Sequence, residues 1–153
     1  MREILYRGKR TDNGEWVEGY YLHVSEGEGT YEVEQHFIKT ENKGRFGLCY
    51  EVIPETVGQY TNVTTNDKKI FDGDILKVKV GVYFNYDTQE YESEGVYVTK
   101  VECKEGGYIE DVIDHDFDCT ALAWLWDCYA DDCEVDIIGN IHDNPELLKE
   151  GAE

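Results

Sequence analysis

The stretch VIPETVGQYTNVTTNDKKIFDGDILKVKV, residues 52–80, decides the fold and lies near the middle of the 153-residue chain. The run that leads into it, residues 45–53, repeats with a period of two and predicts a strand. Pro54 ends that strand, because proline has no N–H to give to a ladder. Residues 61–69 are rich in Thr, Asn, Asp and Lys and therefore predict a turn and loop.

The second half of the stretch contains a turn followed by a strand. Asp72-Gly73-Asp74 predicts a tight reversal, in which the glycine and the aspartates serve turn formation. Residues 75–80 follow with strand periodicity. One face of that strand is apolar and consists of Leu76, Val78 and Val80.

The chain before this stretch predicts one small antiparallel sheet. Residues 2–9 and 15–24 read as a hairpin around Asp12-Asn13-Gly14, since Asn and Gly accept a positive φ at little cost. We expect Trp16 and the Tyr20-Tyr21 pair to anchor this hairpin on the sheet.

Further strands are predicted on both sides of the central stretch. One covers residues 31–38, and its candidate core positions are Tyr31, Val33 and Phe37. The later strands are expected at residues 82–84, 95–103, 108–113 and 134–141.

Two short helices are also predicted. Helical spacing of the apolar residues Leu122, Leu125 and Tyr129 predicts a helix over residues 118–130. A last helical turn begins at Asn144 as the N-cap, with Pro145 at the first helical position, and continues through Leu148.

The predicted fold class is mainly β (β-rich α+β). It consists of two small antiparallel β units or a barrel-like pair, one short helical insert and a short C-terminal helix. The first subdomain is expected at residues 1–60 and the second, barrel-like one at residues 61–153, with an acidic helical insert at about 114–132.

Three segments together resemble the YopX family, small proteins found mostly in phages and prophages of Gram-positive bacteria. VIPETVGQYT followed by KKIFDGDILKV is similar to the family signature, YRGKRTDNGEWVEGYYL resembles its opening, and IIGNIHDNPELL resembles its close. The resemblance covers nearly the whole chain and implies a mainly β, phage-associated protein without implying an activity. Where the family usually carries Asn-Gly ahead of the Gly-Asp turn, this chain has Asn66-Asp67-Lys68-Lys69, which leaves the local turn type open.

The formal net charge is −20, and it is unevenly distributed. Residues 1–60 hold 7 Lys/Arg and 11 Asp/Glu, whereas residues 61–153 hold 7 and 23. Between Lys104 and Lys149 there are 13 acidic residues and no Lys or Arg. Nucleic-acid affinity comes mainly from neutralising phosphates with cations, so direct binding of DNA or RNA is disfavoured.

The sequence predicts that the protein is located in the cytoplasm. No apolar run reaches the length of a membrane span, and the N-terminal MREILYRGKR lacks the apolar region of a signal peptide. The odd number of cysteines and their irregular spacing favour reduced thiols over a disulfide framework. These cysteines are Cys49, Cys103, Cys119, Cys128 and Cys133.

Asp114, Asp116 and Asp118 have a spacing that lets alternate carboxylates point at one cation. A calcium loop of the EF-hand kind requires Gly at its sixth position and Glu at its twelfth, where this chain has Cys119 and Leu125. The segment is therefore interpreted as a solvated acidic loop that caps the following helix, and no metal site is assigned.

The remaining motifs indicate no assembled chemistry. Cys119, Cys128 and Cys133, with His115 nearby, contain no Cys-x-x-Cys pair of the kind that structural zinc sites present, so free thiols are favoured. The two serines lie in polar loops, the four histidines are scattered, and no Gly-rich phosphate loop follows a strand. No catalytic residue and no cofactor is assigned.

Three functions stay open at this point. The first is a non-enzymatic accessory protein that binds a basic protein partner through its acidic surface, although charge that only maintains solubility explains the same composition. The second is a metal-binding protein or enzyme that uses carboxylates and thiols of residues 114–133, and the third is a homo-oligomeric structural protein. The candidate contact residues are Trp124, Trp126, Asp127, Asp131 and Asp132.

Overall fold

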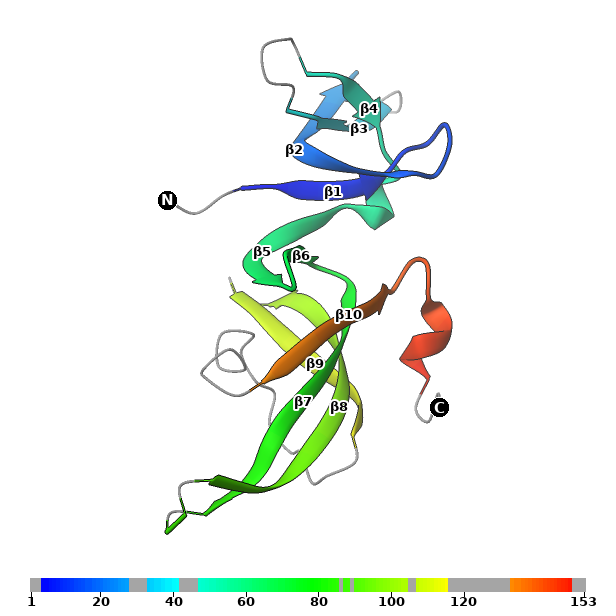
Figure 1. The fold of residues 1–153 in the computed structure, drawn as a ribbon. Coiled ribbons are helices and arrows are strands. Elements are labelled where there is room, and N and C mark those ends of the chain that lie inside the picture. The colour runs from blue at the N-terminus through cyan, green and yellow to red at the C-terminus, as the bar shows by residue number, and fades with distance from the viewer. Residues whose placement is uncertain are drawn as a thin grey trace. The chain divides into compact units, whose positions relative to one another are not determined.

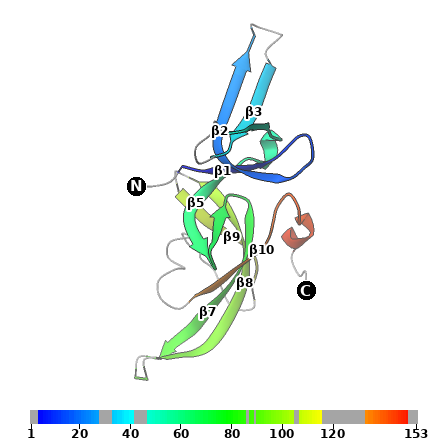
Figure 2. The same cartoon turned by 45° about the horizontal axis from the view of Figure 1, so that its top comes forward.

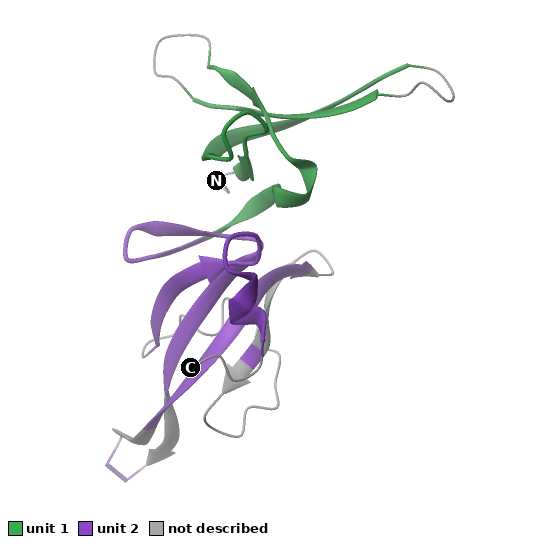
Figure 3. Ribbon diagram, turned by 90° about the vertical axis from the view of Figure 1, so that its right-hand side faces the viewer, with its two compact units in different colours: residues 1–62 green, residues 63–153 purple. Residues whose placement is uncertain are grey.

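The structure is a computed structural model that describes residues 4–27, 33–41, 47–85, 87–88, 90–104, 107–115 and 133–149. This described part contains ten strands and two 3-10 turns and no α-helix (Figure 1), so the expectation of a mainly β protein is confirmed. The strands form two antiparallel sheets. The chain divides into two compact units, Met1–Asn62 and Val63–Glu153 (Figure 3).

The first unit is built on the predicted N-terminal hairpin. Strands β1 (Tyr6–Lys9) and β2 (Trp16–Glu26) pair antiparallel, and Gly14 in the turn between them has a φ of +72°. The second half of β2 pairs instead with β3 (Val33–Lys39), which in turn pairs with β4 (Cys49–Glu51). As a result β2 and β3 extend together beyond β1, as Figure 2 shows.

The VIPET motif forms a 3-10 turn, η2 (Pro54–Thr56), that is tied to β1. The buried Thr56 hydroxyl accepts a hydrogen bond from the Lys9 N–H at 2.9 Å and donates one to the Ile53 carbonyl at 2.6 Å. The Ile53 N–H donates to the Lys9 carbonyl at 2.8 Å. The motif thus provides partners for both backbone groups of Lys9 at the end of β1.

The turn predicted within residues 61–69 is confirmed, but the prediction that the rest of this range is loop is wrong. Strand β5 (Gly58–Thr65) and strand β6 (Lys68–Phe71) occupy this region and form a hairpin. Its two-residue turn is Asn66-Asp67, and both residues have a positive φ, 48° and 61°, as a type I′ turn requires. Threonine is β-branched and fits a strand, so the composition that suggests a loop is compatible with β structure.

The two sheets have simple strand orders. In the first, the order is β4-β3-β2-β1-β5-β6, and β5 runs from one unit into the other. The second sheet consists of β7 (Asp74–Asn85), β8 (Glu90–Lys104), β9 (Gly107–His115) and β10 (Glu134–Asn140), in the order β10-β7-β8-β9. The predicted helical insert at about 114–132 begins too early, because residues 114 and 115 belong to β9, and its remainder lies outside the described residues.

The second unit contains a continuous apolar core beneath the second sheet. The predicted apolar face of the central strand is confirmed, because Leu76 and Val78 are fully buried and Val80 packs against them. Valine from β5, isoleucine from β6, tyrosine and valine from β8 and valine from β10 complete the cluster. Its buried members are Val63, Ile70, Leu76, Val78, Tyr97, Val101 and Val135.

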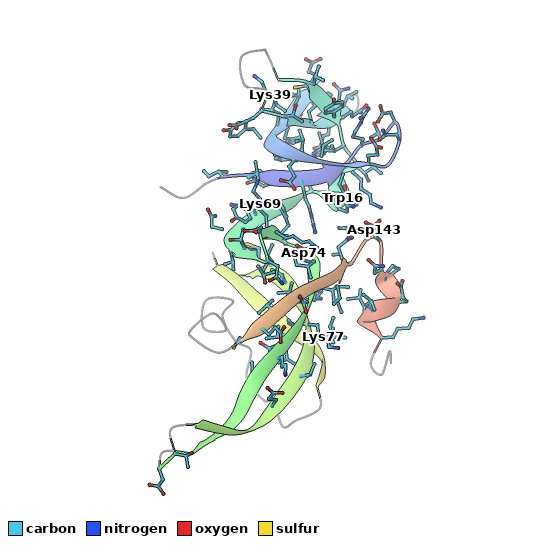
Figure 4. The ribbon with its side chains drawn as sticks, viewed as in Figure 1. Trp16, Lys39, Lys69, Asp74, Lys77 and Asp143 are labelled. Atoms are coloured by element: carbon cyan, nitrogen blue, oxygen red, sulfur yellow. The ribbon has the colours of Figure 1, made fainter. Side chains whose placement is uncertain are left out.

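The Asp72-Gly73-Asp74 turn is confirmed and holds two strands together. The buried Asp74 carboxylate, labelled in Figure 4, accepts a hydrogen bond from the Phe71 N–H at 2.7 Å. Gly73 has a φ of +85°, its N–H donates to the Val101 carbonyl, and its carbonyl accepts from the Ile141 N–H, both at 2.9 Å. The turn therefore links β8 to the end of β10.

The C-terminal helix is a 3-10 turn, η4 (Pro145–Leu148), with Asn144 at its N-cap but without a hydrogen bond from the asparagine side chain to the turn's N–H groups. The Asn144 side-chain oxygen accepts a hydrogen bond from the Asn140 N–H at 3.4 Å instead. The Asn144 oxygen can approach the backbone here because residue 139 is glycine. A Cβ at this position would lie 2.5 Å from that oxygen. The predicted start at Asn144 and Pro145 is confirmed, and the asparagine side chain closes the turn after β10.

The prediction of which β3 side chains point into the core is also wrong. Val33 is 56% exposed and Phe37 is only half-buried, whereas Ile38 is fully buried. Ile38 faces inward because a Cβ on Gly8 of β1 would lie 3.2 Å from both Ile38 and Val52, so the glycine leaves room for these side chains. Tyr31, the third candidate core position, lies outside the described residues.

Candidate functional site

The β2–β3 hairpin brings together two histidines and a glutamate. His23 of β2 pairs directly with His36 of β3, and the next pair on the same face joins Ser25 and Glu34. Residues two apart on a strand point to the same face, so His23, Glu34 and His36 share one. One ligand atom from each of these three side chains lies within 4.8 Å of the other two.

The two imidazoles lie at the end of a row of aromatic rings in contact. The His23 and His36 rings stack with their centroids 4.7 Å apart and their planes 12° apart. His36 Nδ1 shares a hydrogen bond with the Tyr21 hydroxyl at 2.6 Å, and the Tyr21 ring lies 5.4 Å from that of Tyr6. The row runs from half-buried Tyr6 to exposed His23, so the histidines are held at its solvent end.

Tyr21 is held in its neutral form. Burial raises the pKa of the Tyr21 hydroxyl above its ordinary value of 10.0, and the charges of Tyr6 and Glu34 raise it further. A phenol with a raised pKa stays protonated near neutral pH, so His36 Nδ1 has a neutral hydroxyl as its partner.

The opposite face of the hairpin exposes apolar and aromatic side chains. Trp16, expected as an anchor of the sheet, is covered there by the Arg7 guanidinium at 4.7 Å and the Lys9 ammonium at 5.5 Å from its ring centroid. Half-buried Tyr21 contributes to the packing of the inner face, whereas its neighbour Tyr20 is exposed. The exposed side chains of this outer face include Tyr20, Leu22, Val24 and Val33.

Three lysines of the second sheet lie beside carboxylates. Lys79 forms an ion pair with Glu94 at 2.7 Å, and this hydrogen bond holds the pKa of Lys79 above its ordinary value. Lys100 forms an ion pair with Glu102. In the β7–β10 pairing, Lys77, labelled in Figure 4, lies opposite Asp136. The pairs Lys79–Glu94 and Lys77–Asp136 join neighbouring strands and favour the observed register, whereas Lys100 and Glu102 belong to the same strand.

The residues singled out from the sequence are not gathered into a site within the described ranges. Asp114 lies near the end of β9, Cys49 and Cys103 are exposed free thiols, and Cys133 packs against the core of the second unit. The other predicted positions lie outside the described residues. They are Asp116, Asp118, Cys119, Trp124, Trp126, Asp127, Cys128, Asp131 and Asp132.

The histidine cluster was missed because its members are dispersed in the sequence. Glu34 and His36 are two residues apart in a predicted strand, which is the one local signal that they share a face. His23 lies in another strand, and its approach to His36 depends on the β2–β3 register. A search for paired ligands across predicted hairpins would have found the cluster.

Comparison with known proteins gives one match. No curated protein and no solved structure matches this chain. Within the part of the chain that the structure describes, there is no helix with the length and apolar character needed to cross a membrane. The model of the family described as YopX protein matches residues 5–149, and the chain therefore belongs to the YopX family.

Proposed function

We propose that the protein acts by binding a basic protein partner through the acidic surface of its second unit. The observation that carries this proposal is the division of charge. Residues 63–153 contain 7 Lys/Arg and 23 Asp/Glu, while residues 1–62 contain 7 and 11. A surplus of one sign attracts an oppositely charged protein over a distance and raises the association rate more than the final affinity.

The lysines described in the second unit do not offset this surplus. Lys79 forms an ion pair with Glu94 and Lys100 forms one with Glu102, and the segment between Lys104 and Lys149 contains no Lys or Arg. We expect this segment to supply the contact, with tryptophans as anchors and aspartates for steering. The residues concerned are Trp124, Trp126, Asp127, Asp131 and Asp132.

The family membership gives the proposal its setting. YopX-like proteins are associated with phages and prophages, so the partner is proposed to be a basic protein of the bacterial host or of the phage, in the cytoplasm. The proposed role is that of an accessory protein.

The experiment compares two charge-matched variants of the whole chain. The first carries Asp127→Asn, Asp131→Asn and Asp132→Asn, and the second carries Glu26→Gln, Glu51→Gln and Glu55→Gln in the first unit. Each variant and the unaltered chain are used to capture proteins from phage-infected host lysate. The captured protein that depends on the bait is identified and purified, and its association rate is measured at about 0.05 M and about 0.3 M salt.

The proposal expects a basic partner whose association slows severalfold in higher salt. It also expects the aspartate variant to associate more slowly than the glutamate variant. Equal rates for the two variants, or a rate that does not depend on salt, contradict it. Self-association in sedimentation velocity that is lost in Trp124→Ala/Trp126→Ala would favour the homo-oligomeric alternative in its place.

A further inference from the structure

We propose that the β2–β3 hairpin binds one divalent transition-metal ion through His23, Glu34 and His36. This site lies in the first unit and does not depend on the partner proposed above. Within the described residues, these three side chains are the group of His, Cys, Asp and Glu whose ligand atoms approach closely enough for a shared ion. None of the three lies in the segments that carry the family resemblance.

The geometry suits an ion that binds nitrogen and oxygen. Around tetrahedral zinc, ligands at about 2.0–2.1 Å lie roughly 3.3 Å from one another. The present separations, all within 4.8 Å, need a contraction of about 1.5 Å at most. His23 and Glu34 are exposed, so rotation of their side chains can supply this contraction without moving the strands.

The chemical types of the three ligands determine which class of metal ion the site prefers. Two imidazoles and one carboxylate suit Zn²⁺, Co²⁺, Ni²⁺ or Cu²⁺, whereas Mg²⁺ and Ca²⁺ prefer sites made of oxygen. Three protein ligands leave at least one coordination position for water or for a group from another molecule.

Tyr21 acts as a positioning residue for His36. Because Nδ1 of His36 is engaged with the Tyr21 hydroxyl at 2.6 Å, Nε2 is the nitrogen left for the ion. Metal binding selects the tautomer in which Nδ1–H donates to the phenol oxygen and Nε2 carries the lone pair. Because the stacked rings are nearly parallel, their in-plane lone pairs do not converge on one point, so the exposed His23 ring turns out of the stack when the ion binds.

The register of the β2–β3 pairing holds the ligand residues close together in the absence of the ion. His23 and His36 are direct partners in an antiparallel ladder, so their Cα atoms are held at a fixed separation. Glu34 lies one pair further along the same face, beside Ser25. Ligands fixed on two paired strands are more precisely placed than ligands on loops.

The test is a Zn²⁺ titration of the full chain by calorimetry after its thiols have been alkylated with iodoacetamide, so that cysteines do not contribute. The variants His23→Gln, His36→Gln and Glu34→Gln each remove one ligand. His142→Gln is the matched control, because it removes a histidine that lies outside the cluster. Mg²⁺ is titrated in parallel, and circular dichroism verifies that each variant is folded.

We expect one Zn²⁺ per chain, no comparable binding of Mg²⁺, and affinity reduced by at least about tenfold in His23→Gln and in His36→Gln. Glu34→Gln weakens binding less than the loss of a histidine, and His142→Gln leaves it unchanged. No Zn²⁺ binding by the alkylated chain, or equal binding by folded His23→Gln, overturns the proposal. Because His23 is exposed, its variant keeps the test valid even if His36→Gln unfolds.

Tyr21→Phe separates a positioning role from simple packing. It keeps the ring stack but removes the hydrogen bond, so Zn²⁺ affinity should fall roughly tenfold. The long-range ¹⁵N–¹H NMR spectrum of the imidazoles should show His36 bound through Nε2, with Nδ1 protonated, in the unaltered chain. Coordination through Nδ1, or an affinity that Tyr21→Phe does not change, would exclude the positioning role.

Discussion

At the scale of single residues, two of the segments that resemble the family contain side chains that hydrogen-bond to backbone groups. Thr56 of the VIPET segment satisfies Lys9 N–H and Ile53 C=O, and Asp74 accepts from Phe71 N–H. Burying such polar groups is favourable only when they are hydrogen-bonded. These motif positions therefore carry structural roles in the fold.

Among the described residues, Thr99 of β8 departs from the rule that buried polar groups are hydrogen-bonded. It is fully buried, and its hydroxyl has no hydrogen-bond partner. A buried hydroxyl without a partner destabilises the folded state, while valine has nearly the same shape and no polar atom to desolvate. Thr99 therefore lowers the stability of the second unit.

We predict that Thr99→Val raises the free energy of unfolding by about 1 kcal/mol. The matched substitution Thr56→Val should lower it by about 1–3 kcal/mol, because it removes the hydroxyl that accepts from the Lys9 N–H, whereas the Ile53 carbonyl keeps the Thr56 N–H as a donor. Urea denaturation measures both changes. A loss of stability in Thr99→Val would show that its hydroxyl has a partner in solution.

At the scale of elements, the β5–β6 hairpin shows how a turn can form without glycine. Asn66 and Asp67 both adopt a positive φ, which non-glycine residues rarely do, although Asn and Asp do so most readily. Asn66 also donates a hydrogen bond to Asp136 at 3.2 Å, and Thr65 donates to the Val135 carbonyl at 2.6 Å. These contacts with β10 help to hold the turn in place.

We predict that Asp67→Gly stabilises the protein by about 0.5 kcal/mol, because glycine adopts the positive φ of a type I′ turn without steric cost. Asp67→Val should destabilise it by about 1–2 kcal/mol, since a β-branched residue is poorly accommodated there. Both variants lose the same charge, so their difference in urea midpoint reports the backbone alone. Equal midpoints would contradict the assigned turn.

At the scale of the whole molecule, the net charge of −20 opposes folding through self-repulsion. Salt shortens the Debye length from about 30 Å at 0.01 M to about 8 Å at 0.15 M, and so weakens repulsion between distant carboxylates. The ion pairs Lys79–Glu94 and Lys100–Glu102 are too few to reverse the sign of this effect.

We predict that raising NaCl from about 0.01 M to about 0.15 M increases Tm, by roughly 2–4 °C for each kcal/mol of repulsion relieved. The Asp127→Asn/Asp131→Asn/Asp132→Asn variant should gain less than the unaltered chain, because it starts with less repulsion. Differential scanning calorimetry measures both slopes. A Tm that falls with salt would mean that attractive pairs dominate the charge interactions.

The sequence by itself determined the local features of this protein. Gly14 and Gly73 at positive φ, the strand that ends before Pro54 and the apolar face of Leu76 and Val78 all follow from neighbouring residues. The three family segments and the excess of acidic residues are also properties of the chain alone. These features depend on φ preferences, missing N–H groups and periodicity, which act within a few residues.

The tertiary structure decided which residues meet across strands. Alternation in β3 is compatible with either face inward, and close packing of Ile38 against Gly8 and Val52 selects one of them, with Val33 exposed. The same register places His36 beside His23 and so forms the candidate metal cluster. A shift of one residue in that pairing would send these side chains to opposite faces, because side-chain direction alternates at every residue of a strand.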